Sequence, residues 1–183
     1  MICVFTHTLK TAGMKNTIRI WLTVIITWLA VNTNAQQPQT ALDLNNQLAS
    51  ITDSLYLKGQ QWGTKFTEVA ESKDFAALKP YRENIQHFIS GQLKTVKGMK
   101  DINGSENLRL VIIEFLNYEN KMVTDGFIPV EKLPKTATED DLKKVIQDLT
   151  EASKDEASLL KKVSEAQDAY AQKNGFTIEA PDK

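Results

Sequence analysis

Cysteine and histidine are almost absent from this sequence of 183 residues, which contains one Cys and two His. The only cysteine, Cys3, and one histidine, His7, lie within the first 35 residues. Beyond residue 35 the sequence therefore has no cysteine and a single histidine, His87. From residue 36 onward the chain can therefore form no disulfide and offers neither a thiol nucleophile nor a cysteine ligand for a metal. Its stability has to come from packing.

The scarcity of histidine also argues against the metal and catalytic sites that a helical protein can carry. A carboxylate-bridged di-iron site in a helical bundle uses two Glu-x-x-His motifs, whereas here Glu83 precedes His87 by four residues. Covalent haem attachment requires a Cys-x-x-Cys-His motif, and a Ser-His-Asp hydrolase commonly has a nucleophile-elbow motif; neither is present. We therefore expect a protein that is not an enzyme and has no metal or other cofactor.

A surplus of basic residues is likewise missing. The chain carries 22 Lys and Arg against 23 Asp and Glu, and Lys10, Lys15 and Arg19 precede residue 36. Beyond residue 35, 19 basic residues remain against 23 acidic ones, which leaves a net charge of −4. Nucleic-acid binding depends on neutralising phosphates with lysine and arginine, so this balance argues against a nucleic-acid partner.

Residues 1–35 have the composition of a signal peptide. They contain three basic residues, no acidic residue and an apolar run from Ile18 to Val31. The run is shorter than the roughly 20 residues that a membrane-spanning helix needs, and Thr33-Asn34-Ala35 is typical of a cleavage site. We expect cleavage before Gln36, export to the periplasm, the cell surface or the medium, and no membrane span after cleavage. The alternative is that this segment remains attached as an anchor.

Residues 36–183 contain four segments in which apolar residues recur every three or four positions, as they do in amphipathic helices. We expect these helices to cover Thr40 to Val69, Asp74 to Met99, Ser105 to Gly126 and Thr138 to Gly175. Asp74 and Ser105 are expected to cap the second and third helices. Thr40 and Thr138 each precede an aspartate by three residues, as in a capping box, and Asn174-Gly175-Phe176 predicts a Schellman-type end.

Prolines predict two departures from regular helix. Pro80 lies beyond the first turn of a helix that begins at Asp74, so we expect a kink or a late helix start there. Pro129 and Pro134 oppose helix between Phe127 and Thr138, where we expect an irregular strap packed over one end of the bundle.

The four apolar faces can be buried only against one another, because no strand-like segment is present to cover them. The first two turns between the helices are short, which makes neighbouring helices antiparallel. The sequence therefore predicts an all-α fold, with residues 36–183 forming a single domain. That domain is expected to be an antiparallel up-down-up-down four-helix bundle.

Three residues are candidates for a ligand site inside the bundle: Glu156, Glu119 and Trp62. Glu156 interrupts the apolar face of the last helix, and Glu119 lies close to the apolar face of the third. Such a glutamate either fixes the helix register or belongs to a ligand or cation site. Trp62 is the only tryptophan beyond residue 35, and it either packs in the core or lines a pocket for an apolar ligand. Three aromatic residues lie near it in the sequence: Tyr56, Phe66 and Tyr81.

The third helical segment carries a hydrophobic pattern that is found in a known group of proteins. Its residues are Leu108, Ile112, Phe115, Leu116 and Glu119, with Tyr118 among them. With the leader and the four-helix layout, this pattern resembles exported bacterial surface proteins of uncharacterised function, a family named from a leptospiral member. The resemblance covers most of residues 36–183 and implies an envelope or secreted location. It supplies no catalytic residues.

Together these features predict an exported, non-enzymatic helical-bundle protein of the bacterial envelope that acts by surface-mediated binding or has a structural role. The alternative is a bundle that binds a small ligand in a pocket between its helices. The partner is accordingly expected to be a protein or a small ligand.

Overall fold

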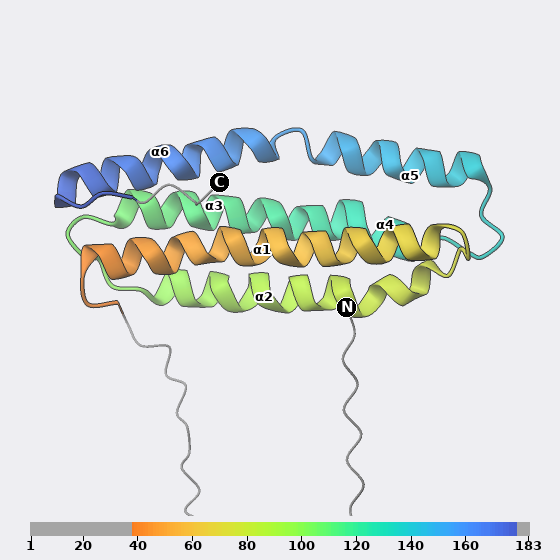
Figure 1. The fold of residues 1–183 in the computed structure, drawn as a ribbon, viewed down its shortest axis with the longest axis horizontal. Helices are drawn as coiled ribbons and strands as arrows, with labels where there is room; N and C mark the ends of the chain where they lie inside the picture. Colours follow the sequence, from red (N-terminus) through yellow and green to blue (C-terminus); the bar gives the residue numbers. More distant parts are fainter. Residues whose placement is uncertain (1–37, 179–183) are drawn as a thin grey trace, which may run out of the picture. The chain divides into compact units, whose positions relative to one another are not determined.

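The computed structural model describes residues 38–178, in which every regular element is a helix. This confirms the prediction of an all-α protein for that part of the chain. Figure 1 shows the long helices α1 (Ala41–Ala70), α2 (Lys79–Gly98), α3 (Glu106–Met122), α5 (Glu139–Ala152) and α6 (Glu156–Asn174). The course of the chain is compatible with the predicted up-down arrangement. The predicted signal peptide and its cleavage site lie outside the described residues.

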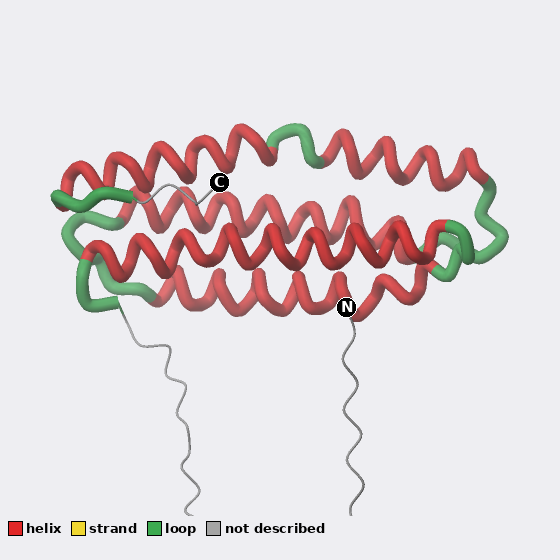
Figure 2. The backbone as a smooth tube through the Cα atoms, viewed as in Figure 1, coloured by secondary structure: helices red, strands yellow, loops and turns green. Residues whose placement is uncertain are grey.

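Three shorter helices connect the long ones. A 3-10 helix, η1 (Phe75–Leu78), precedes α2, while a π-helix, η2 (Val123–Phe127), and a short α-helix, α4 (Ile128–Glu131), follow α3. In Figure 2 the loops lie at the ends of the long helices, while η2 and α4 follow α3 without a loop. No helix between residues 38 and 178 is both long and apolar enough to cross a membrane.

The sequence correctly predicted three helix ends. Asp43 N donates a hydrogen bond to Thr40 Oγ1 (3.1 Å), while Thr40 N donates to Asp43 Oδ2 (3.2 Å), which completes a capping box. Thr138 and Asp141 form the same pair of bonds at the start of α5. These contacts join residues only three positions apart, so the local sequence is enough to specify them.

The end of α6 is the third helix end that the sequence predicted correctly. Gly175 adopts a left-handed conformation with φ 73°, and Phe176 N donates to the Ala171 carbonyl (3.2 Å). The Phe176 ring packs edge-on against Tyr170, with 6.0 Å between ring centroids. Both features belong to the predicted Schellman-type end.

Two predicted caps are wrong. Asp74 makes no side-chain cap, and α2 begins at Lys79, so Pro80 lies in the first turn, where a missing N–H costs no helical hydrogen bond. This confirms the late helix start. The Ser105 side chain does not cap α3, because its hydroxyl donates to Asp101 Oδ1 (3.1 Å) and accepts from Ile102 N (3.1 Å).

The prediction of a strap at residues 127–138 is wrong in expecting irregular conformation throughout, although Phe127, Val130 and Leu133 do pack against the core. The chain passes from α3 through η2 into α4 without leaving helical conformation, so the third helix does not end at Gly126. Pro129 is tolerated because it lies in the first turn of α4. Within the predicted strap, non-helical backbone is limited to the stretch between α4 and Thr138, where Pro134 lies.

The predicted fourth helix is divided in two at residues 153–155. In a continuous helix the Ala152 carbonyl would accept from Glu156 N, but here the Tyr118 hydroxyl of α3 donates to that carbonyl. Glu156 N donates instead to the Ser153 carbonyl (3.2 Å). Glu156 therefore begins α6 and does not lie in the middle of an uninterrupted helix, as its sequence pattern predicted.

The hydrophobic core lies among α1, α2, α3 and α6. Its fully buried side chains include Leu44 and Leu48 of α1, Ile89 of α2 and Ile112 of α3. The helix α5 differs from these four, because none of its residues is buried and it packs chiefly on η2 and α4. The apolar residues Leu142, Val145 and Leu149 of α5 are partly buried and pack against the edge of the core.

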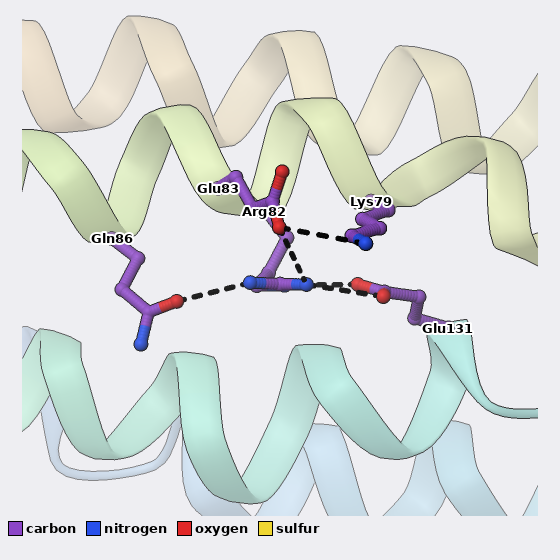
Figure 3. Close-up of polar contacts among 5 residues, drawn as sticks. All are labelled: Lys79, Arg82, Glu83, Gln86 and Glu131. Carbon is purple, nitrogen blue, oxygen red and sulfur yellow. Dashed lines mark hydrogen bonds and ion pairs between the residues drawn. The ribbon is translucent and has the colours of Figure 1, made fainter.

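An ion pair holds α4 against α2 (Figure 3). Arg82 Nε donates to Glu131 Oε2 (2.9 Å) and Arg82 Nη2 to Glu131 Oε1 (3.1 Å). Arg82 Nη1 donates further to Gln86 Oε1 (3.0 Å). The two charged side chains are only 11% and 14% exposed, so this paired contact is largely shielded from water. It fixes α4, which directly follows Phe127 of η2.

Candidate ligand-binding site

A pocket of ≈ 450 Å³ lies where α1, α3, η2 and the junction of α5 with α6 meet. Its wall is mostly apolar and consists of side chains from all five helices, among them Leu55, Phe115, Met122, Phe127, Leu149 and Leu160. Tyr56 and Leu160 are exposed to solvent, so the pocket opens beside them.

Two glycines on α1 help to form this space. Gly59 and Gly63 both line the pocket and, being four residues apart, lie on the same face of the helix. A Cβ atom added at either position would meet nothing within 4 Å. The helix continues through both glycines without a break. Their lack of side chains therefore leaves room inside the pocket.

Trp62 forms one wall of the pocket and is 5% exposed. Its ring stacks on Phe127 with 4.2 Å between centroids and an angle of 14°, and on Phe66 at 5.6 Å and 7°. Trp62 Nε1 is buried and has no hydrogen-bond partner in the structure. Of the aromatic residues that the sequence placed near it, Tyr56 lines the same pocket, whereas Tyr81 does not.

Glu119 of α3 and Glu156 of α6 line the same pocket, so the structure brings together the three residues that the sequence singled out separately. Glu119 Oε1 is buried and has no hydrogen-bond partner. Burial, with the nearby negative charge of Glu156 as the second cause, raises the pKa of Glu119 to about 7. Burial also raises the pKa of the half-buried Glu156.

No cation of the described chain compensates these two carboxyl groups. The residues that line the pocket include no lysine, arginine or histidine. The ion pairs found between residues 38 and 178 involve neither Glu119 nor Glu156. Lys162 of α6 instead pairs with Glu114. The pocket is thus an apolar space that contains acidic groups without a protein counter-charge.

The described residues hold no group of three or more His, Cys, Asp or Glu side chains that could bind a metal ion. Two carboxyl groups and an apolar wall suit a small organic molecule better, because pockets for such molecules are mostly apolar with a few placed polar groups. Phe127 is one of the lining residues that the sequence did not assign to a site. The nearby prolines led to its assignment to an irregular strap.

The negative charge of Glu156 contributes to the raised pKa of Glu119, and a substitution can test this contribution. In Glu156→Gln, the pKa of Glu119 is expected to fall below about 7. It should stay above its ordinary value, because burial remains. Carbon-13 NMR titration of the Glu119 carboxyl group measures this change. Glu165→Gln, an exposed position on the same helix, is the matched control and should leave the titration unchanged. An unaltered Glu119 titration in Glu156→Gln would mean that the two charges do not interact.

Comparison with protein-family models, curated proteins and solved structures gave no match to this chain. The resemblance to the leptospiral-type surface proteins therefore stays a prediction. Any functional proposal has to rest on the residues of the pocket.

Proposed function

We propose that this protein is an exported, non-enzymatic, antiparallel up-down-up-down four-helix bundle that binds a small, largely apolar ligand in the pocket between α1, α3 and α6. The pocket itself carries the proposal. Its volume of ≈ 450 Å³ falls within the range of about 300–1,000 Å³ that is usual for small-molecule sites. This function is the second of the two that the sequence left open.

The polar groups of the pocket support ligand binding rather than packing alone. Trp62 Nε1 and Glu119 Oε1 are both buried without a hydrogen-bond partner, and leaving such a group unsatisfied costs about 1–3 kcal/mol. A ligand that bonds to either atom would offset that cost. The lining residues include no cysteine or lysine, which argues against nucleophilic catalysis by a thiol or an amine.

Surface-mediated binding and an envelope location stay predictions from the sequence. The exposed large apolar side chains of the described residues are distributed over five helices: Leu42, Tyr56, Leu57, Tyr81, Leu110, Ile146 and Leu160. Single exposed apolar residues of this kind are normal for a protein surface. They therefore favour no particular docking face.

The variant Gly59→Leu tests the proposal by filling the pocket. A leucine side chain there would extend into open space, and it favours helix over glycine by nearly 1 kcal/mol, so the melting temperature should stay the same or rise. In the wild type, 1-octanol should raise the melting temperature in a saturable way, because a ligand that binds only the folded state stabilises it. In Gly59→Leu this increase should disappear.

Gly91→Leu is the matched control. Gly91 lies on α2, where an added Cβ also meets nothing within 4 Å, and it does not line the pocket. This variant should keep the full response to 1-octanol. The proposal fails if 1-octanol does not stabilise the wild type, or if the response survives in Gly59→Leu.

A further inference from the structure

We infer that the ligand is an amphipathic organic cation, whose amine binds at the carboxyl groups of Glu119 and Glu156 while its apolar body lies against Trp62 and Phe127. This inference rests on the proposed function, because it names the chemical class of the ligand for the same pocket.

The first argument is charge complementarity. Two acidic side chains from different helices, α3 and α6, line one apolar pocket, and no basic side chain of the described residues lines it with them. Carboxylates that are partly removed from water are usually paired or hydrogen-bonded, because their desolvation is otherwise costly. Glu119 Oε1 has no such partner. A cationic ligand would supply both the hydrogen bond and the missing positive charge.

The second argument is the aromatic wall next to these acids. Trp62 and Phe127 stack face to face on each other, and both line the pocket beside the two glutamates. Aromatic side chains of this kind can cover an aliphatic or aromatic ligand body. An acidic surface beside an aromatic one is therefore suited to an amine with an apolar body.

Two other classes of ligand fit less well. A carboxylate or phosphate ligand would bring a third negative charge to a pocket that contains no basic side chain. A bare metal ion would find no cluster of three or more ligating side chains among residues 38–178, whereas sites for hard cations such as Ca²⁺ provide six or more oxygen ligands. A neutral alcohol would bind the apolar wall without using the charge of the carboxylates.

Three probes with the same number of carbon atoms and different polar groups distinguish these ligand classes: octylamine, 1-octanol and octanoate. Isothermal titration calorimetry of the full chain at pH 8 should give an affinity for octylamine at least roughly tenfold above that for 1-octanol. Octanoate should bind most weakly. In Glu119→Gln and in Glu156→Gln the affinity for octylamine should fall by roughly tenfold, while the affinity for 1-octanol stays the same.

Binding of 1-octanol also shows that the pocket is intact in each variant, so loss of octylamine binding cannot come from misfolding. Glu114→Gln is the matched control, because Glu114 lies on α3 and does not line this pocket. Equal affinities for octylamine and 1-octanol would overturn the inference, and so would a higher affinity for octanoate than for octylamine. Either result would leave the proposed function standing. Failure of 1-octanol to bind the wild type would overturn the proposed function as well.

Discussion

Replacing Arg82 with methionine is expected to lower the free energy of unfolding by about 3 kcal/mol. Arg82 donates two hydrogen bonds to Glu131 across the contact between α2 and α4, and both side chains are largely buried. The variant leaves the Glu131 carboxylate shielded from water without its partner. Removing one member of such a pair costs more than the pair itself contributes, because the remaining charge is still desolvated.

Urea denaturation followed by circular dichroism at 222 nm measures this loss. The double variant Arg82→Met/Glu131→Leu should recover most of the lost stability, since an apolar pair of similar size often replaces a buried ion pair without cost. Lys161→Met is the control. Lys161 and Glu165 are 77% and 64% exposed, so this change should alter stability by less than about 1 kcal/mol. Equal effects of Arg82→Met and Lys161→Met would show that the Arg82 contact is no stronger than a surface pair.

The second large effect that we expect is a loss of stability as the pH rises. Burial raises the pKa of Glu119 to about 7 in the folded protein, whereas in the unfolded chain this pKa should lie near its ordinary value of 4.5. Between these two values the folded state binds a proton that the unfolded state has lost, so stability falls as the pH rises. Through this group alone, the free energy of unfolding should decrease by up to about 3 kcal/mol between pH 4.5 and pH 7.

The surroundings of Glu119 support this direction. Glu156 of α6 is the other acidic group in the pocket, and Tyr56 is the only further titratable side chain that lines it; η2 and α5 contribute the apolar Phe127 and Leu149. Burial and the negative charge of Glu156 both favour the protonated form of Glu119. A neutral side chain of the same shape should therefore remove the destabilisation.

Urea denaturation at a series of pH values from 5 to 8 tests this effect. The wild type should lose stability as the pH rises, whereas Glu119→Gln should show a flatter profile and should exceed the wild type in stability at pH 8. Glu114→Gln, an exposed position on the same helix, should keep the wild-type slope. If Glu119→Gln retained that slope, the pH dependence would have to come from another group.

The features that the sequence predicted correctly depend on residues close together in the chain. The Thr40 and Thr138 capping boxes join positions three residues apart, and Gly175 ends α6 within one turn. The break before Glu156 was not predicted, and the contact found at it is distant in the sequence: the Tyr118 hydroxyl, 34 positions before Ala152, donates to the Ala152 carbonyl. Helical periodicity carries no information about such a contact.

The candidate site was predicted only in part for the same reason. Glu156 and Glu119 were recognisable because each is an acidic residue on or near an apolar helix face, and Trp62 because it is the only tryptophan beyond residue 35. That the three line one pocket depends on how α1, α3 and α6 pack, which the sequence pattern does not specify. Phe127 joins them because η2 extends α3.

The most direct test of the ligand site is an NMR titration of the indole N–H of Trp62, identified by the loss of its signal in Trp62→Phe. This N–H is buried and has no acceptor in the structure. On addition of octylamine we expect its proton and nitrogen shifts to change and to saturate at one ligand per chain. We expect no change in Gly59→Leu, in which the pocket is filled. An indole signal that stays constant while octylamine binds to the wild type would place the ligand outside this pocket and contradict the proposed site.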